Sequence, residues 1–261
     1  MKNINFEEGR EKKRESKMNA NVELNKLNKD IENQYEPKND PVPIITFDYE
    51  LDLFEKYKAI DFVFLIDSTG SMNPYGRGVK NIVKKIMWDL EKFILRFNLD
   101  DINVLQFGMV TYKDHSDENK TYLTRKDVNL THDTNQIINA LNKLKFDGGK
   151  DEQEALLDGL NTAINDINWR HNSIKFICNI LDAPCHGKIY SDNKRDNFEN
   201  CPYGLDIDKI FSNMQNNGIK YYIIKLNDSM NKMIEEFKKK MYINCFSPKV
   251  VYDKSKSSTQ N

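Results

Sequence analysis

The sequence lacks long hydrophobic runs and an excess of charge of either sign. No run approaches the roughly 18–20 apolar residues that a membrane-spanning helix needs, and residues 1–19 offer no apolar stretch for a signal peptide. The 39 basic and 40 acidic residues leave a net charge of −1, so no overall field attracts nucleic acid. These absences predict a cytoplasmic protein with no membrane span and no nucleic-acid partner.

The sequence also lacks a cysteine pattern. Its four cysteines form no CxxC pair and no regular spacing, so nothing in their arrangement indicates disulfides or a reactive thiol pair. They are Cys178, Cys185, Cys201 and Cys245. Cys178 falls inside an apolar run and is predicted to be a small core residue.

What is present is a core-forming composition behind a charged amino-terminal segment. Hydrophobic residues make up 39% and aromatic residues 11% of the 261 residues, enough for one sizeable domain. Of the first 40 residues 18 are charged, too polar a segment to offset its ordering entropy by burial. Residues 1–43 are therefore predicted to be a disordered charged tail, 55–245 the folded domain, and 246–261 a short C-terminal extension.

Strand-like and helix-like patterns alternate along this domain. Nearly continuous apolar runs, typical of strands buried on both faces, alternate with segments whose apolar residues recur every three or four positions. The predicted strands are 60–66, 104–112, 121–130, 174–181 and 219–226, and the predicted helices are 75–97, 131–144, 153–167, 207–215 and 229–241. This alternation predicts an α/β fold with an open, mostly parallel sheet, helices on both faces and one antiparallel edge strand at 121–130.

Polar residues gather where two of the predicted strands end. In such sheets ligands bind beyond the carboxyl ends of the strands. The first strand runs into DSTGS at 67–71, and another ends just before Asp182. Asp67, Thr69 and Ser71 alternate, so an extended turn can aim one carboxylate and two hydroxyls at one point. Oxygen ligands of this kind suit a hard cation and favour Mg²⁺, with Ca²⁺ or Mn²⁺ as alternatives.

The run FVFLIDSTGSM resembles the metal-ion-dependent adhesion site of the von Willebrand factor A domain (vWA) family, whose signature is Asp-x-Ser/Thr-x-Ser after a buried strand. Asp182 matches the family's second characteristic Asp. The stretches FGMVTYKD at 107–114, GGKD at 148–151 and DAPCHG at 182–187 are similar to the A domains of alpha-kinase family proteins. The resemblance covers residues 55–245 and implies a Rossmann-like sheet with a cation that captures an acidic side chain of a partner protein.

One position departs from the family pattern. The family supplies a Thr from its second loop, and the register through Ala155-Leu156 places Lys150 there. A protonated lysine cannot ligate a cation, so the neighbouring Asp151 is predicted to complete the site. A second carboxylate would hold the ion more firmly and weaken its attraction for a partner's carboxylate. The predicted metal ligands are Asp67, Thr69, Ser71, Asp151 and Asp182.

Two catalytic interpretations compete with metal-dependent binding. A strand that ends in Asp-x-Asp marks haloacid-dehalogenase-type phosphatases, but here Thr69 occupies the acid position and cannot donate a proton at neutral pH. Cys185-His186 would need a third orienting group to act as nucleophile and base, so a structural role is expected, with His186 near the cation as an alternative. Asp114, His115 and Asp117 are expected to form a solvated loop, with contact to a metal as the alternative.

The expected function is a non-catalytic, cation-dependent protein-interaction module, because hard oxygen ligands gather without a catalytic acid or nucleophile beside them. The resemblance leaves a second possibility, a shortened relative or subunit of an alpha-type protein serine/threonine kinase with the A domain as its targeting part. The sequence contains no glycine-rich phosphate loop. A third possibility is a scaffold whose metal site is vestigial. The polar insert at 187–205 is the expected place of specificity.

Overall fold

The computed structural model describes residues 57, 59–95, 104–191, 196–240 and 249–253, the last as a backbone path. The chain divides into two compact units, Met1–Asp40 and Pro41–Asn261, and every described residue belongs to the second. The predicted tail at 1–43 lies outside the described residues, as does the predicted extension at 246–261 apart from one strand.

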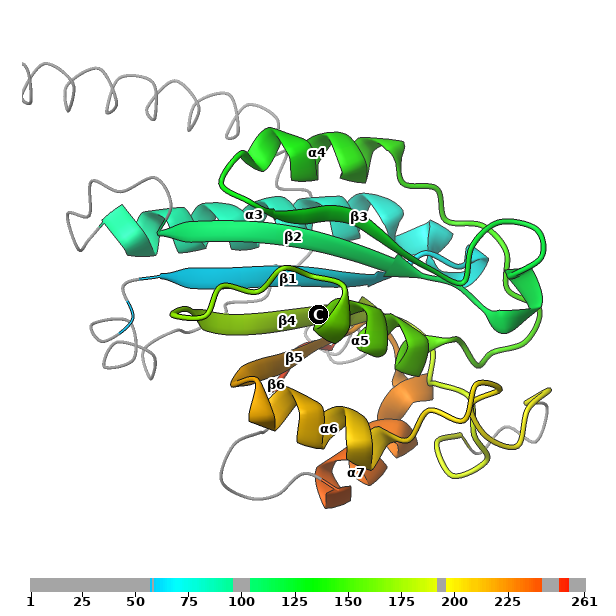
Figure 1. Cartoon of the computed structure of the whole chain (residues 1–261). Coiled ribbons are helices and arrows are strands. Elements are labelled where there is room, and N and C mark those ends of the chain that lie inside the picture. Colours follow the sequence, from blue (N-terminus) through cyan, green and yellow to red (C-terminus); the bar gives the residue numbers. More distant parts are fainter. Residues whose placement is uncertain (1–56, 58, 96–103, 192–195, 241–248, 254–261) are drawn as a thin grey trace, which may run out of the picture. The chain divides into compact units, whose positions relative to one another are not determined.

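The described part of the second unit is built around a six-stranded sheet (Figure 1). Its strands are β1 (Ile60–Asp67), β2 (Leu105–Tyr112), β3 (Thr124–Thr131), β4 (Ile174–Leu181), β5 (Ile219–Lys225) and β6 (Lys249–Asp253). They lie in the order β3-β2-β1-β4-β5-β6, and each neighbouring pair is parallel except β2 with β3. The predicted open, mostly parallel sheet with one antiparallel edge strand is confirmed.

The strand β1 shows why such apolar runs occupy the middle of the sheet. All eight of its residues are buried, and successive side chains point to opposite faces. Phe62 and Phe64 belong to the hydrophobic cluster on one face, whereas Val63 and Leu65 belong to the cluster on the other. A strand covered on both faces needs a nearly continuous apolar run, which is the pattern that the sequence carries here.

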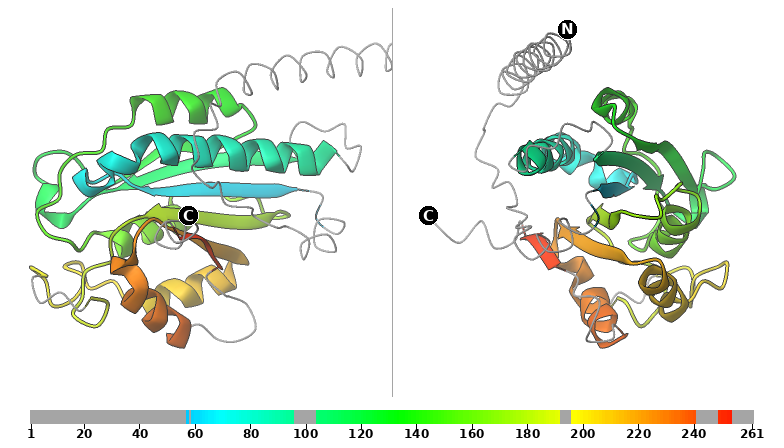
Figure 2. Two further views of the ribbon diagram at one scale, coloured as in Figure 1. Left: turned by 180° about the vertical axis from the view of Figure 1, so that it is seen from behind. Right: turned by 60° about the vertical axis from the view of Figure 1, so that its left-hand side comes forward.

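Helices cover both faces of the sheet, as predicted. They are α3 (Gly76–Leu95), α4 (Thr134–Lys143), α5 (Leu156–Asn165), α6 (Ile207–Asn216) and α7 (Asn231–Lys240). α3 and α4 contribute to the cluster of Phe62, and α5, α6 and α7 contribute to the cluster of Val63. Figure 2 shows α3 and α5 on opposite sides of the sheet. Of the helices in the described segments, none combines the length and apolar character that crossing a membrane requires.

The helix α5 begins later than predicted, and the residues before it pair with the loop after β4. The helix expected from residue 153 begins at Leu156. Glu154 is held in an extended path instead, because its N–H donates to Pro184 O at 2.9 Å and it pairs in parallel with Cys185. This pairing fastens the segment before α5 to the loop after β4.

A buried ion pair ties the amino ends of the central strands to the segment before β4. Asp61 in β1 is fully buried. Its carboxylate accepts hydrogen bonds from Arg170 N at 2.9 Å, Arg170 Nε at 2.6 Å and Ser173 Oγ at 2.8 Å. Arg170 Nη2 also donates to the carbonyl groups of Ile60 and Val104. A carboxylate buried this deeply depends on its cationic partner.

We expect Asp61→Ala to lower the free energy of unfolding by about 3 kcal/mol, because the Arg170 guanidinium would lose its carboxylate partner. Urea unfolding measures the loss. Asp89→Ala is the matched control, since Asp89 pairs with Lys85 at 2.6 Å on the partly exposed surface of α3 and should lose less than about 1 kcal/mol. Equal losses in the two variants would contradict a stabilising role for the Asp61 pair.

Candidate functional site

The carboxyl end of β1 carries a buried aspartate. Asp67 is the last residue of β1, and its side chain has 0% exposure. The Thr69 backbone N–H and hydroxyl both donate to Asp67 Oδ1, at 2.9 and 2.7 Å. These two bonds turn the chain directly after the strand and hold the Thr69 hydroxyl beside the carboxylate. Figure 1 shows this edge at the right-hand end of the sheet.

A chain of hydrogen bonds continues from Thr69 to the end of β4. Thr69 Oγ1 lies 3.2 Å from Ser71 Oγ, and Ser71 Oγ donates to Asp182 Oδ1 at 2.9 Å. Because β1 and β4 are neighbouring parallel strands, their carboxyl ends meet at the same edge. The structure therefore brings four of the five predicted ligands into one connected group, here called the Asp67 group. Its members are Asp67, Thr69, Ser71 and Asp182.

A second loop packs closely on the turn after β1. Gly70 N donates to Gly148 O at 3.1 Å, and Asp147 N donates to Ser68 O at 3.1 Å. Gly148 has a φ of +84°, a conformation that glycine adopts without the cost paid by other residues. The buried ammonium group of Lys113 donates to Ser68 O at 3.1 Å and also to Asp147. The Lys113 ammonium group thereby links the two loops.

Glu154 is a carboxylate at this site that the sequence prediction missed. It is 2% exposed and lies close enough to Asp67 for the charge of Asp67 to raise its pKa. A Cβ placed on Gly149 would lie 3.2 Å from Glu154 Oε1 and 3.6 Å from Thr69 Cβ, so the loop glycine leaves room for both side chains. A sequence signal existed, namely an acidic residue directly before the apolar helix that follows the glycine loop.

The protein itself provides too few hydrogen bonds and positive charges to balance the carboxylates at the carboxyl ends of the strands. Burial, and then the charge of Asp182, raises the pKa of Asp67 to about 7. Burial, and then the charges of Asp67 and Asp114, raises the pKa of Glu154 well above its usual value. Burial likewise raises the pKa of Asp182. Asp67 Oδ2 and Glu154 Oε2 are buried, and neither receives a hydrogen bond from the described residues. A divalent cation would supply the charge that these oxygens lack.

Asp151 lies in a different group from the one predicted for it. Its Oδ2 accepts a hydrogen bond from Asn197 N at 2.9 Å. Ligand atoms of Asp151, Asp114 and His186 all lie within 4.8 Å of one another. The chain continues past Asp151 and pairs at Glu154 with the loop after β4. The charge of Asp67 acts on the pKa of Glu154. Lys150, the residue at the family's Thr position, is exposed.

The polar residues after β2 are buried, so the prediction of a solvated loop there is wrong. Asp114 and Asp117 are 0% and 4% exposed. His186 bridges two carboxylates, with Nε2 3.0 Å from Asp114 Oδ1 and Nδ1 2.9 Å from Asp196 Oδ1. Burial lowers the pKa of His186, but these hydrogen bonds outweigh burial and raise the pKa. Asp196 belongs to the polar insert, which explains how a charged segment becomes buried. The structural role predicted for His186 agrees with this network.

A comparison with protein families identifies the family of the chain. The family described as von Willebrand factor type A domain matches residues 61–259 of the chain. The chain belongs to this family. The match confirms the resemblance seen in the sequence, and the whole Asp67 group lies inside the A domain.

The A domain is also similar to part of a curated protein, the alpha-protein kinase vwkA of Dictyostelium discoideum. The two are 28% identical over 184 residues, which make up 70% of this chain and 28% of the relative. The chain therefore spans little more than a quarter of that relative's length. This likeness confirms the predicted similarity to the A domains of alpha-kinase family proteins.

Solved structures with similar folds include the SpRpn10 VWA domain, with 15% identity and a TM-score of 0.44 over 78% of this chain and 95% of that one. Another is proximal thread matrix protein 1 from the mussel byssus, described with a zinc-occupied MIDAS motif. It shows 19% identity and a TM-score of 0.49 over 75% of this chain and 41% of that one.

We expect Gly70→Ala to destabilise the A domain by about 1–3 kcal/mol, the usual cost of overpacking. The added Cβ would lie 2.8 Å from Gly148 O, and a backbone oxygen cannot move aside as a side chain can. Gly78→Ala in the first turns of α3 is the control, because nothing lies within 4 Å of its added Cβ. That variant should be neutral or gain up to about 1 kcal/mol. Urea unfolding that ranks the two variants equally would refute the close docking of the two loops.

Proposed function

We propose that this A domain is a non-catalytic protein-interaction module whose binding depends on a divalent cation held by the Asp67 group. One observation carries the proposal. Asp67 Oδ2 is a buried carboxylate oxygen without a hydrogen-bond donor among the described residues, at the start of a connected row of hard oxygen ligands. Such an oxygen is costly to bury unless a cation binds it.

The residues would divide the work of holding the ion. Asp67 and Asp182 provide carboxylate oxygens, and the hydroxyls of Thr69 and Ser71 lie between them. Glu154 takes the role first predicted for Asp151, as a further carboxylate that binds the ion directly or through water. Oxygen ligands with two hydroxyls favour Mg²⁺, with Ca²⁺ or Mn²⁺ as alternatives.

A partner protein can reach the ion from one side. Asp67, Thr69 and Asp182 are buried, whereas Ser71 is exposed at the surface. A cation bound between them would therefore present its remaining coordination position next to Ser71, to water or to a carboxylate of the partner. Glu154 adds negative charge behind the ion and so limits how strongly the ion attracts that carboxylate. The proposed partner is a protein with an acidic side chain at the contact.

The likeness to an alpha-protein kinase supports a second candidate function. The relative is about three and a half times as long as the matched part, so this chain corresponds to one portion of it. A chain of this kind could act as the targeting part of an alpha-type serine/threonine kinase, as a shortened relative or as a subunit. The two candidates share the same metal-dependent contact and differ in the partner that it holds.

We expect Mg²⁺ to raise the melting temperature of the chelator-treated protein by roughly 5–10 °C at about 100 times its dissociation constant. Asp67→Asn should abolish the rise, because the amide cannot supply the charge that the ion requires. Asp166→Asn is the matched control, since Asp166 is exposed and distant in sequence from the ligands. Differential scanning calorimetry with and without Mg²⁺ measures the rise in melting temperature of each protein. Equal rises in the wild type and Asp67→Asn would remove the metal site.

We also expect partner retention to depend on the same ion. Immobilised wild-type chain should retain a defined set of proteins in Mg²⁺, and the set should be lost both in chelator and with Asp67→Asn. Mass spectrometry of the retained proteins distinguishes the two candidates, since an alpha-type kinase among them supports the targeting function. A set retained equally in chelator would instead support a scaffold with a vestigial site.

A further inference from the structure

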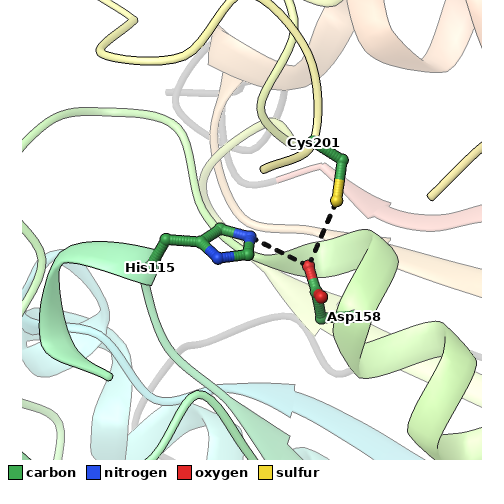
Figure 3. A group of neighbouring side chains, drawn as sticks. All are labelled: His115, Asp158 and Cys201. Carbon is green, nitrogen blue, oxygen red and sulfur yellow. Dashed lines mark hydrogen bonds and ion pairs between the residues drawn. The ribbon is translucent and has the colours of Figure 1, made fainter. Parts of the chain in front are cut away.

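A second group of potential metal ligands lies outside the Asp67 group. Figure 3 shows the side chains of His115, Asp158 and Cys201 pointing toward one another. They come from three separate segments: the 3-10 helix after β2, the first turn of α5, and the polar insert before α6. One ligand atom from each residue lies within 4.8 Å of the other two. We call these residues the His115 group.

The distances within the group fit a tetrahedral site. Asp158 Oδ2 lies 3.0 Å from His115 Nε2 and 3.5 Å from Cys201 Sγ. Zinc–ligand bonds of about 2.0–2.3 Å at tetrahedral angles require separations of about 3.4 Å between nitrogen and oxygen and about 3.6 Å between sulfur and oxygen. These two separations would need shifts of only a few tenths of an ångström to hold an ion, and the ligand atoms of His115 and Cys201 lie within 4.8 Å of each other.

The chemistry of the group selects a particular class of ion. A neutral imidazole, a carboxylate and a thiolate together carry two negative charges, which balance a dication in a buried place. A mixed set of nitrogen, oxygen and sulfur ligands suits Zn²⁺ and related transition metals, whereas Mg²⁺ and Ca²⁺ require oxygen. The Asp67 group, which offers oxygen ligands alone, favours hard ions such as Mg²⁺ instead.

The surroundings hold the three ligands in place. The side chains of His115 and Asp158 are 4% and 8% exposed, and Cys201 is 7% exposed. The His115 ring packs edge-on against Phe198 and Tyr203, with ring centroids 5.8 and 5.3 Å away. Ligands whose orientation is already fixed lose little freedom when an ion binds.

We propose that the His115 group is a Zn²⁺-class site with three protein ligands and water in the fourth position. The ion would fasten the insert that carries Cys201 to the loop after β2 and to α5. His115 also adjoins His186, whose ring centroid is 5.3 Å away in the loop after β4. The zinc site thus braces the segments that follow Asp182 and shape the edge where the proposed partner would bind.

The site can be tested by replacing zinc with cobalt, because a thiolate ligand to Co²⁺ produces a sulfur-to-metal charge-transfer band. The full chain is stripped with chelator, saturated with Mg²⁺ to fill the Asp67 group, and titrated with Co²⁺ and then Zn²⁺. We expect the band to appear with one Co²⁺ per chain and to disappear as Zn²⁺ displaces it. Cys201→Ser should abolish the band and weaken Zn²⁺ binding by at least about 10-fold, while the serine still donates to Asp158.

Three further variants separate this site from other causes. His115→Gln should also weaken Zn²⁺ binding, whereas Cys178→Ala, at a buried thiol in β4, should leave the band intact. Asp67→Asn should keep the band as well, so a failure of the Mg²⁺ site and a failure of this site give different results. No band in the wild type, or a band that survives Cys201→Ser, would overturn the proposal and leave a purely hydrogen-bonded triad.

Discussion

The negative charge of Asp67, buried at the end of β1, is the constraint on which the rest of the site depends. Burial and then the charge of Asp182 raise the pKa of Asp67, and the charge of Asp67 in turn raises the pKa of Glu154. Two hydrogen bonds from Thr69 to one carboxylate oxygen, and the charge of Lys113, offset only part of this cost of ionising Asp67. A bound dication would resolve the remaining imbalance, and it would do so at the point where separate segments of the chain already meet.

The fold makes this convergence possible through parallel pairing. In β1 and β4 the register aligns Ile66 with Ile180, so the residues that follow the two strands emerge side by side. The second loop is then fastened to the turn after β1 through Gly70 and Lys113. Sheet and loops therefore position the oxygen ligands before any ion binds, which reduces the entropy lost on binding. The Asp61–Arg170 pair supports the opposite ends of the same strands.

The sequence allowed the sheet and all four members of the Asp67 group to be predicted, because both follow from the patterns of the strands and the residues at the strand ends. A strand buried on both faces must be apolar throughout, and alternating Asp67, Thr69 and Ser71 directly after it lie on one turn. The position of Glu154 near Asp67 could not be predicted, since it depends on the pairing of Glu154 with Cys185, a contact between distant segments. The burial of the polar residues after β2 could not be predicted for the same reason, because the insert that covers them follows much later in the chain.

The central claim is that one divalent cation binds between Asp67 and Asp182. A crystal structure of the A domain grown with Mn²⁺ and measured at the manganese absorption edge would test this directly. The account predicts an anomalous peak at direct coordination distance, about 2–2.5 Å, from the hydroxyls of Thr69 and Ser71. No peak there, with the Asp67 carboxylate satisfied by protein groups alone, would contradict the account.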